Sequence, residues 1–552
     1  MMTPNFEHEL APNEANHVPL SPLSFLKRAA RVYPQRDAVI YGERRYSYQQ
    51  LHQRSRALAS ALERVGVQPG ERVAILAPNI PEMLEAHYGV PGAGAVLVCI
   101  NIRLEARSIA FILRHSSAKV LLCDREFGPV VREALALLDS PPLLVGIDDT
   151  QADAVDLVSD LDYETFLTQG DPGRPLSAPQ NEWQSIAINY TSGTTGDPKG
   201  VVLHHRGAYL NACAGALAFQ FGPRSVYLWT LPMFHCNGWS HTWAVTLSGG
   251  THVCLRKVLA PAIHAAIAAH GVTHMSAAPV VMSMLIHAEP AQGAARSEPV
   301  SLITGGAAPP SAVIAAMEAR GFSITHAYGM TESYGPSTLC LWQPGIDELP
   351  LEERARFMSR QGVAHPMLEE ATVLDSETGR PVPADGATLG ELVVRGNTVM
   401  KGYLDNPEAT RSALANGWLH TGDLAVLHPD GYVEIKDRAK DIIISGGENI
   451  SSLEIEEALY LHPAVIEAAV VARPDSRWGE TPHAFVTLRD DALANVSGDD
   501  LIRWCRQHMA GFKAPRYVSL AALPKTATGK IQKFVLREWA RAEEAATTEE
   551  QH

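Results

Sequence analysis

A run of glycines and hydroxyl residues that ends in a lysine lies between Tyr190 and Gly200, and it reads Tyr-Thr-Ser-Gly-Thr-Thr-Gly-Asp-Pro-Lys-Gly. Glycines let backbone N–H groups turn toward an anion, the hydroxyl groups add donors, and Lys199 adds positive charge. This is not a Walker A loop, because Pro198 and Gly200 flank the lysine where that motif has glycine and a hydroxyl residue. The loop suits a polyphosphate, although a solvated Gly/Ser/Thr linker would look similar.

A second glycine-hydroxyl segment, His326-Ala-Tyr-Gly-Met-Thr-Glu332, follows the strand-like residues 322–325 and is predicted to form a turn. Glu332 is a candidate magnesium ligand, because Mg²⁺ takes one or two carboxylates and completes its shell with water and phosphate oxygens. Tyr328 offers a flat face for a purine. The alternatives are a surface carboxylate and a tyrosine packed in the core.

Three further segments could hold parts of a nucleotide. The segment Thr304-Gly-Gly-Ala-Ala-Pro309 ends a strand with two glycines, where a planar base could approach the backbone. Asp423 could accept both hydroxyls of a ribose, and Arg438 could contact the same sugar. Lys530 lies in a glycine-containing turn, where a lone lysine is usually solvated.

An aromatic segment, Leu231-Pro-Met-Phe-His-Cys-Asn-Gly-Trp-Ser-His-Thr-Trp243, is rich in residues that could wall a pocket. His235, Trp239 and Trp243 are spaced i, i+4, i+8, which predicts one shared face if the segment is helical. For the tryptophans, core packing is the alternative to substrate contact. His241 suits a metal by residue type, but the sequence has no H-E-x-x-H motif, so a zinc site is not expected.

Short apolar runs alternate with helix-like stretches, which predicts an α/β fold with parallel strands buried between helices. Around residues 431–445 the pattern changes to two short strands with a charged joint. Beyond it, the capping-box spacing at Ser451 predicts a helix to about Tyr460, followed by strands near residues 465–472 and 484–488. We therefore expect a large lobe at residues 1–437 and a small mobile α+β lobe at residues 438–552. The predicted parallel strands are Val73–Leu76, Ala95–Ile100, Lys119–Cys123, Leu143–Gly146 and Ser301–Thr304.

Composition and charge are those of a globular, enzyme-sized protein. The chain has 552 residues, of which 46% are hydrophobic and 19% charged, and its formal net charge of −15 gives no basic footprint for nucleic acid. Its seven cysteines form no C-x-x-C pair, which fits a reducing compartment. No signal peptide, membrane-spanning stretch or peroxisomal address is recognised, so we expect a cytoplasmic protein.

Taken together and in order, these segments resemble the adenylate-forming superfamily of acyl-CoA synthetases, luciferases and nonribosomal adenylation domains, from about Pro22 to Lys533. The resemblance implies a carboxylic acid activated by ATP to an acyl-adenylate with release of pyrophosphate. It then implies attack by the CoA thiol to give acyl-CoA and AMP. Mg²⁺ would be the cofactor, with ATP and CoA as co-substrates.

The resemblance also implies roles for individual residues. Thr331 would contact the α-phosphate, Lys530 would be the adenylation lysine, Lys440 the hinge between the lobes, and His235 a catalytic neighbour in the acyl pocket. Mg²⁺ would be held by Glu332 and Thr191. The ATP site would comprise Thr191, Ser192, Gly193, Thr194, Thr195, Gly196, Lys199, Gly305, Gly306, Ala307, His326, Ala327, Tyr328, Gly329, Met330, Thr331, Asp423, Arg438 and Lys530. The acyl pocket would comprise His235, Trp239 and Gly305, and the CoA channel Ser445, Gly446 and Gly447.

The acyl segment narrows the expected acid. Amino-acid-activating relatives carry an aspartate where His235 stands, so an uncharged acyl group is favoured. The segment is most similar to that of short- to medium-chain acyl-CoA synthetases, including those for methylthio-propionate, and of plant enzymes for fatty or aromatic acids. Its aromatic crowding indicates a short pocket.

Two other functions remain open on the sequence alone. One is a nucleotide-binding regulatory protein without turnover, although binding alone needs neither Lys530 nor Lys440. The other is an adenylating enzyme with an acceptor other than CoA, such as a carrier protein, or a luciferase-like oxidation. The sequence does not decide between a monomer and a homodimer.

Overall fold

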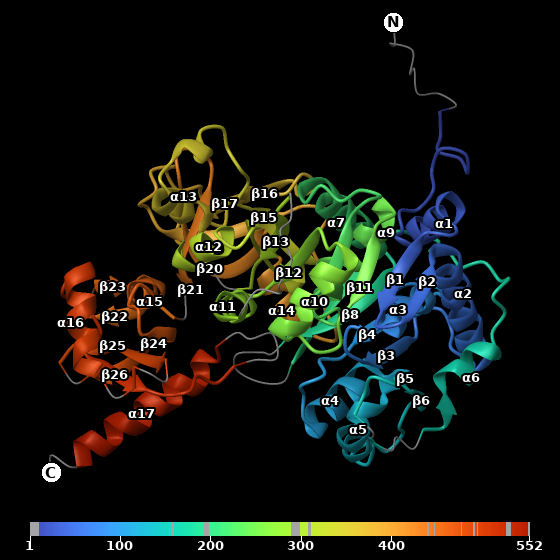
Figure 1. Ribbon diagram of the computed structural model, residues 1–552, viewed down its shortest axis with the longest axis horizontal. Coiled ribbons are helices and arrows are strands. Elements are labelled where there is room, and N and C mark those ends of the chain that lie inside the picture. The colour runs from blue at the N-terminus through green and yellow to red at the C-terminus, as the bar shows by residue number, and fades with distance from the viewer. Residues whose placement is uncertain are drawn as a thin grey trace, which may run out of the picture.

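The computed structural model describes residues 10–153, 155, 159–191, 198–288, 298–306, 311–438, 441–446, 448–475, 477–489, 492–493, 495–525 and 531–549. Figure 1 shows a larger body built from the N-terminal and central parts of the chain, with the C-terminal elements grouped beside it. This is the expected α/β architecture of a large and a small lobe.

Two large sheets form the centre of the larger lobe. The first has the order β16-β15-β14-β13-β12-β10-β11-β1-β2, and the second β19-β9-β8-β4-β3-β5-β6-β7. The five runs predicted as parallel strands are β3, β4, β5, β6 and β13, and each pairs in parallel with its neighbours, which confirms the prediction. The strands of these sheets are β1 (Asp37–Tyr41), β2 (Arg44–Ser47), β3 (Arg72–Leu76), β4 (Val96–Cys99), β5 (Ala118–Asp124), β6 (Leu143–Ile147), β7 (Leu161–Asp162), β8 (Ser185–Thr191), β9 (Lys199–His204), β10 (Val226–Trp229), β11 (Thr251–Cys254), β12 (His274–Ala277), β13 (Val300–Thr304), β14 (Phe322–Met330), β15 (Gly335–Leu339), β16 (Val363–Ala364) and β19 (Gly402–Tyr403).

Helices cover these sheets and bury their apolar faces (Figure 1). The helix that begins at Tyr48 shows how the sequence sets a start: the Ser47 hydroxyl accepts from Gln50 N–H while the Gln50 side chain accepts from Ser47 N–H. The helices of the larger lobe are α1 (Leu23–Val32), α2 (Tyr48–Arg64), α3 (Pro81–Gly92), α4 (Ala106–Ser116), α5 (Gly128–Leu135), α6 (Tyr163–Thr168), α7 (His205–Ala218), α8 (Cys236–Trp239), α9 (His241–Ser248), α10 (Ala260–His270), α11 (Pro279–His287), α12 (Ser311–Glu318), α13 (Leu351–Met358) and α14 (Pro407–Ala413).

A buried charge cluster ties the two large sheets together. Arg256, just after β11, donates to both carboxylate oxygens of Asp124 at the end of β5, and also to Asp149 and Glu126. Tyr41 of β1 donates to the same Asp149 carboxylate at 2.5 Å. Each charge is paired, as burial of charge requires.

A smaller antiparallel sheet leads from the large lobe to the small one. Its order is β17-β18-β20-β21, and its last strand ends at Arg438. Its strands are β17 (Glu370–Leu374), β18 (Gly390–Arg395), β20 (Leu419–Leu427) and β21 (Val433–Arg438).

The C-terminal lobe has its own sheet and core. The strand order is β23-β22-β25-β24, with β26 paired to β25. Ser451 caps α15 by accepting from Glu454 N–H, and the strands expected near residues 465–472 and 484–488 are β24 and β25. The elements are β22 (Ile443–Ser445), β23 (Glu448–Ile450), α15 (Ser452–Tyr460), β24 (Val465–Asp475), β25 (Gly479–Leu488), α16 (Gly498–His508), β26 (Tyr517–Leu520) and α17 (Lys533–Glu549).

A buried polar cluster joins the two lobes. Lys533 of α17 forms an ion pair with Glu456 of α15 at 2.8 Å and donates to Ser452 Oγ at 2.6 Å. Asp437, near the end of β21, accepts from Ser452 N–H at 2.6 Å. Asp441 forms an ion pair with Arg537 of α17. The boundary at residues 437 and 438 remains a prediction, and these contacts lie on both sides of it.

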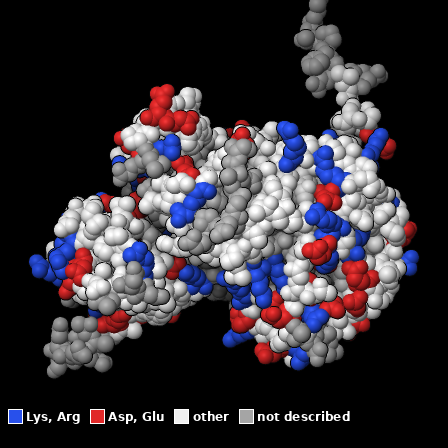
Figure 2. Space-filling view, in the orientation of Figure 1, with Lys and Arg blue, Asp and Glu red and all other residues white. Residues whose placement is uncertain are grey.

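The described surface carries charges of both signs. Figure 2 shows Lys and Arg side chains interspersed with Asp and Glu over the visible face of the larger lobe. In the part of the chain that the structure describes, no helix is both long enough and apolar enough to cross a membrane.

Candidate functional site

The carboxylate of Glu332 lies where two distant segments meet. Glu332 belongs to a short 3₁₀ turn, Thr331–Ser333, directly after β14, and only 7% of it is exposed. The hydroxyl of Tyr403 in β19 donates to Glu332 Oε1 at 2.8 Å. Lys199 Nζ lies 5.0 Å from the centroid of the Tyr403 ring. The tyrosine therefore links the carboxylate to the lysine that ends the glycine-hydroxyl loop.

Burial shifts the pKa values of both Glu332 and Tyr403. Burial raises the pKa of Glu332, while the Tyr403 hydrogen bond and the positive charge of Lys199 act in the opposite direction. Burial also raises the pKa of Tyr403, and the neighbouring Glu332 carboxylate raises it further, so the hydroxyl stays protonated and remains a donor. The sequence reasoning missed Tyr403. Only the pairing of β19 with β9, Tyr403 opposite Val201, brings it to the site.

The donors around Glu332 are compatible with a magnesium ion. A carboxylate and the hydroxyl of Thr331 are hard oxygen donors, which Mg²⁺ prefers, and the remaining positions of its shell are usually filled by water and phosphate. Among the described residues no three His, Cys, Asp or Glu side chains converge as a metal cluster. A site with one protein carboxylate is therefore the arrangement that these residues fit.

The structure brings Asp423 and Arg438 together, as their proposed contact with one sugar requires. They are register partners on β20 and β21, and Arg438 Nε lies 3.1 Å from Asp423 Oδ1. The hydroxyl of Tyr328 donates to Asp423 Oδ2 at 2.5 Å. Each oxygen of Asp423 thus already accepts one contact, and a sugar hydroxyl would share these oxygens.

The segment from His326 to Met330 is not the predicted turn. It completes strand β14, and the turn begins only at Thr331. His326 is buried, and its Nδ1 lies 2.9 Å from the backbone oxygens of both Ser359 and Arg360. Burial lowers the pKa of His326 to about 4, so the ring is neutral and anchors the strand to the chain after α13. Ala327 and Gly329 continue the strand, paired with Leu339 and Pro336 of β15.

Gly305 follows β13, as predicted, and its lack of a side chain is required. A Cβ there would lie 2.6 Å from the Ala327 backbone oxygen and 3.1 Å from the Trp239 ring. Gly306 comes next with φ +83°, a conformation that favours glycine. Thr304 Oγ1, at the end of β13, is buried without a hydrogen-bond partner among the described residues.

The shared helical face predicted for His235, Trp239 and Trp243 is wrong. Cys236, Asn237, Gly238, Trp239 and Ser240 all have positive φ, from 48° to 61°, so this turn is left-handed. Trp243 lies in the following helix, α9, fully buried, with its Nε1 donating to the His87 backbone oxygen at 3.3 Å. Helical periodicity does not apply across a left-handed turn, so the two tryptophans have separate surroundings.

The left-handed turn places Trp239 between two glycines. A Cβ on Gly305 would approach one edge of the indole, and a Cβ on Gly335 would lie 3.0 Å from the opposite part of the side chain. His235 is half-buried at the start of the turn. The next residue, Cys236, has its sulfur 3.2 Å from the Thr331 hydroxyl. The acyl-pocket candidates therefore lie beside the turn that carries Glu332.

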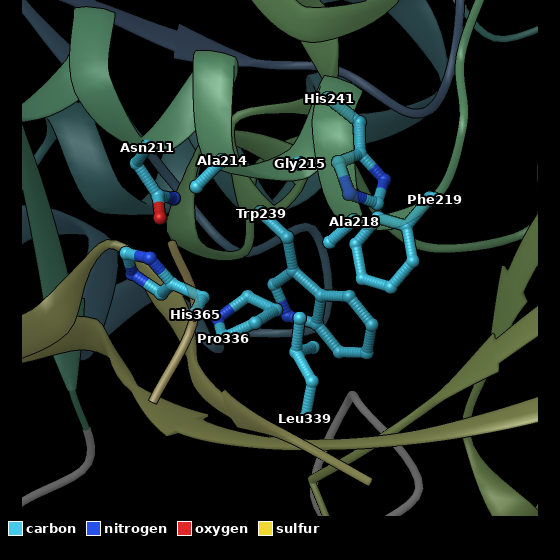
Figure 3. A pocket seen from close by; sticks show the side chains of 10 residues that line it. All are labelled: Asn211, Ala214, Gly215, Ala218, Phe219, Trp239, His241, Pro336, Leu339 and His365. Carbon is cyan, nitrogen blue, oxygen red and sulfur yellow. The ribbon is translucent and has the colours of Figure 1, made fainter. Parts of the chain in front are cut away.

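A small cavity opens beside Trp239 (Figure 3). Its free space is about that of one water molecule. Figure 3 shows the Trp239 ring at its centre, with α7 and His241 on one side and the segment of Pro336 and Leu339 on the other. The lining residues are Asn211, Ala214, Gly215, Ala218, Phe219, Trp239, His241, Pro336, Leu339 and His365.

The residues predicted for a CoA channel lie in the small lobe. Ser445 ends β22 and pairs with Gly479 of β25. Gly446 has φ +61°, its N–H donates to the Trp478 backbone oxygen at 2.8 Å, and a Cβ there would lie 2.7 Å from the Trp478 ring. The sequence reasoning missed Trp478, which the hairpin-like approach of β22 and β25 places over the glycine.

Several predicted residues lie outside the described part of the chain, so their positions stay predictions. Thr191 and Lys199, which pair across β8 and β9, are described at the two ends of the glycine-hydroxyl loop. The undescribed site residues are Ser192, Gly193, Thr194, Thr195, Gly196, Ala307, Lys440, Gly447 and Lys530.

Comparison with known proteins places these features in one family. Residues 26–404 match the family model of the AMP-binding enzyme, and residues 454–530 match that of the AMP-binding enzyme C-terminal domain. The chain belongs to the AMP-binding enzyme family. The predicted membership of the adenylate-forming superfamily is confirmed.

Characterised relatives resemble the chain over nearly its whole length. It is 52% identical to acetate–CoA ligase CCL3 of Humulus lupulus over 545 residues, 96% of each chain. It is 51% identical to the peroxisomal acetate/butyrate–CoA ligase AAE7 of Arabidopsis thaliana over 540 residues, 95% of each chain. It is also 45% identical to the peroxisomal benzoate–CoA ligase of Arabidopsis thaliana, over 97% of this chain and 95% of that protein.

Solved structures share the fold. The anthranilate CoA ligase AuaEII in complex with anthranoyl-AMP matches with a TM-score of 0.84 at 25% identity, over 97% of this chain and 100% of that one. The fatty acyl CoA synthetase of Mycobacterium tuberculosis matches with a TM-score of 0.71 at 30% identity, over 95% and 99%. The predicted activity class is confirmed: the chain is an ATP-dependent acyl-CoA ligase.

Proposed function

We propose that this ligase activates short carboxylic acids with an uncharged acyl chain, of the size of acetate to butyrate. The observation that carries the proposal is the position of Trp239, which fills the space between Gly305 and Gly335 and leaves a cavity no larger than about one water molecule. The names of the acetate and acetate/butyrate ligases that resemble the chain support the same size class.

The test is a panel of acids supplied with ATP, Mg²⁺ and CoA. Straight-chain acids from two to eight carbons, with benzoate and cinnamate, would be compared by AMP release and by thioester formation. We expect kcat/KM to be highest among the acids of two to four carbons. A maximum at octanoate or at an aromatic acid would contradict the proposal, and AMP release without thioester would point to another acceptor.

We propose that the nucleotide lies along the ends of β8, β9, β13 and β14. Lys199 and the loop before it would face the phosphates, while Asp423 and Arg438 would hold the ribose. Their ion pair on neighbouring strands supports this role, because it fixes the carboxylate before a sugar arrives. The glycine at 305 would leave room for the base beside the backbone.

Mg²⁺ would be held by Glu332, with Thr191 and Thr331 as neighbouring oxygen donors. When bound, the ion would neutralise part of the negative charge on the phosphates. The chain's own contribution is to hold the Glu332 carboxylate in one orientation, through the hydrogen bond from Tyr403. Thr331, whose hydroxyl contacts Cys236, would orient the α-phosphate.

The chemical difficulty is the approach of two anions, the carboxylate and the α-phosphate. A lysine that contacts both would offset their repulsion and stabilise the charge that develops in the transition state. We propose Lys530 for this role and His235 as its neighbour at the acyl carbonyl. Because the thiol must later reach the same carbonyl, rotation about Lys440 would remove the lysine turn and bring the face of Ser445 to Gly447 into its place.

Positive charge near that face supports its proposed contact with CoA, which carries phosphates. The guanidinium groups of Arg477 and Arg516 lie 4.8 Å and 5.0 Å from the Trp478 ring centroid, and Trp478 packs over Gly446. Both arginines are exposed. They could therefore meet an anionic ligand without the desolvation that a buried pair would need.

Replacing Trp239 with glycine is expected to raise the ratio of kcat/KM for octanoate to that for butyrate by tenfold or more (~10-fold per 1.4 kcal/mol), because the indole no longer closes the cavity. The ratio is measured by thioester formation. Trp243→Phe is the control, since Trp243 is also buried but does not line the cavity. An unchanged profile in a folded Trp239→Gly protein would remove Trp239 from the pocket wall.

Replacing Tyr403 with phenylalanine is expected to raise the Mg²⁺ concentration for half-maximal adenylation by roughly 10-fold, because Glu332 loses its orienting donor while Lys199 keeps its ring contact. A Mg²⁺ titration of pyrophosphate release measures this change. Tyr432→Phe is the control, because its hydroxyl bonds Leu341 and Gln343 elsewhere. Equal Mg²⁺ dependence in parent and variant would show that the Tyr403 hydroxyl does not position the ligand.

The cellular location and the oligomeric state stay predictions. A cytoplasmic location is expected from the sequence, whereas several similar ligases are named as peroxisomal. Fractionation of cells would determine the cellular location. Sedimentation of the purified protein would decide between a monomer and a homodimer.

A further inference from the structure

One residue that lines the cavity beside Trp239 has a buried polar atom without a hydrogen-bond partner among the described residues. His241 is fully buried, and its Nε2 has no hydrogen-bond partner among the described residues. Two other polar side chains of the lining, Asn211 and His365, have hydrogen-bond partners. The Asn211 amide donates to Ser240 Oγ and to the Tyr334 backbone oxygen, while His365 accepts from Met367 N–H and lies 3.4 Å from the Thr398 hydroxyl.

Neighbouring hydroxyls define the state of the His241 ring. The Tyr227 hydroxyl donates to Ser276 Oγ at 2.8 Å, so its oxygen is the acceptor for His241 Nδ1–H at 3.1 Å. Burial lowers the pKa of His241 to about 3, so the ring is neutral at physiological pH. In a neutral ring with the proton on Nδ1, Nε2 is a bare acceptor.

The unpartnered edge of the ring faces the cavity. A Cβ on Gly215 of α7 would lie 3.5 Å from His241 Cδ2 and 3.6 Å from Nε2, and Gly215 lines the cavity. Figure 3 shows His241 between Gly215 and Phe219, above the Trp239 ring. The surrounding walls are apolar and aromatic: the ring centroids of Phe219 and Trp239 lie 5.4 Å and 6.3 Å from that of His241.

These observations restrict the group that would satisfy Nε2. It must donate a hydrogen bond, because the nitrogen only accepts. It must be uncharged, because the apolar walls and the neutral ring offer no counter-charge. It must also be about the size of a water oxygen, because the cavity has no more room.

We propose that His241 Nε2 recognises a hydroxyl group on the acyl chain, so that the ligase takes short hydroxy-substituted carboxylic acids. This inference rests on the proposed function, since it places the acyl chain beside Trp239. The hydroxyl donates to Nε2, and no covalent step is involved. An acid without the hydroxyl leaves the buried acceptor unpaired, which disfavours it.

Matched pairs of acids test the proposal: propionate with 3-hydroxypropionate, butyrate with 4-hydroxybutyrate, and pentanoate with 5-hydroxypentanoate. The readout is the ratio of kcat/KM for the hydroxy acid to that for its unsubstituted partner. In the His241→Phe variant we expect this ratio to fall about tenfold at the best chain length, because the acceptor for the hydroxyl is gone. His274→Phe is the control, because His274 does not line the cavity and its Nε2 contacts the Phe219 backbone oxygen.

Gly215→Ser provides a second variant that does not depend on replacing the histidine. The new Cβ makes only ordinary contacts, and its hydroxyl can donate to Nε2 in place of a ligand. The same fall in the ratio is expected. A ratio within threefold of the parent at every chain length in both variants would overturn the proposal, while continued activity of the parent on acetate or butyrate would leave the proposed function intact.

Discussion

Replacing Lys530 with alanine is expected to lower the rate of acyl-adenylate formation by about 10²- to 10³-fold, the usual effect of removing one group that stabilises transition-state charge. Thioester formation from supplied acyl-adenylate and CoA should change by less than about threefold, because the proposed role of Lys530 ends once pyrophosphate has left. The two half-reactions are measured separately, the first by pyrophosphate release and the second by thioester formation.

Lys530 lies outside the described residues, but the residues that flank its segment are described and contact each other. Lys525 and Ile531 form an isolated antiparallel bridge, and Gln532 N–H donates to the Pro524 backbone oxygen at 2.8 Å. Lys533 then enters its buried ion pair with Glu456. The described residues on both sides of Lys530 thus contact each other and the rest of the small lobe.

Lys525→Ala is the matched control for this experiment. Lys525 is a lysine at the base of the same turn, and its ammonium contacts Glu467 of the small lobe. It should therefore leave both half-reactions near the parent rate. Equal loss of the two half-reactions in Lys530→Ala would contradict the assignment, since a residue needed only for adenylation cannot slow the transfer to CoA.

Replacing Glu332 with glutamine is expected to reduce kcat/KM for ATP by roughly 10²-fold and to raise the Mg²⁺ requirement of adenylation. The change keeps the shape of the side chain and an oxygen that can accept from Tyr403. It removes the negative charge that a divalent cation needs and that lies near Lys199. Pyrophosphate release over a Mg²⁺ titration is the measurement.

Glu318→Gln controls for the loss of a partly buried carboxylate. Glu318 forms an ion pair with Arg354 at 2.7 Å, in a part of the larger lobe away from Tyr403 and Lys199. We expect its Mg²⁺ dependence to match that of the parent. If Glu332→Gln also retained the parent's Mg²⁺ dependence and rate, Glu332 would not be the magnesium ligand.

The buried polar cluster between the lobes affects the choice of residues for the Lys530 and Glu332 experiments. Asp437 lies in β21, whereas Ser452, Glu456 and Lys533 belong to helices α15 and α17 of the small lobe. Removing one member of such a buried set costs stability, because the remaining charge is left without a partner. Glu332 lies outside this cluster, so the effect of its replacement can be assigned to the reaction and not to a loosened junction.

The sequence alone determined the family, the order of its motifs and five of the parallel strands. Runs such as Val73–Leu76 are buried on both faces, so their uninterrupted apolar character is visible in the residues themselves. The sequence also predicted that Asp423 and Arg438 contact one sugar, and the structure places the two side chains 3.1 Å apart. The role of the glycine-hydroxyl loop stays a prediction, because residues 192–197 lie outside the described part of the chain. The i, i+4, i+8 spacing of His235, Trp239 and Trp243 predicted a shared helical face, and this prediction was wrong. A left-handed turn between them breaks the helical geometry on which the spacing argument depends.

Only the tertiary structure decided how distant residues complete the site. Tyr403 and Glu332 are 71 residues apart, and they meet because β19 pairs with β9. His241 becomes a cavity residue because α7 presents Gly215 to it and Tyr227 occupies its other nitrogen. Such contacts depend on strand register and on the absence of a side chain at one position of a facing helix. Neither leaves a local signal, so the fold must bring the residues together before their chemistry can be seen.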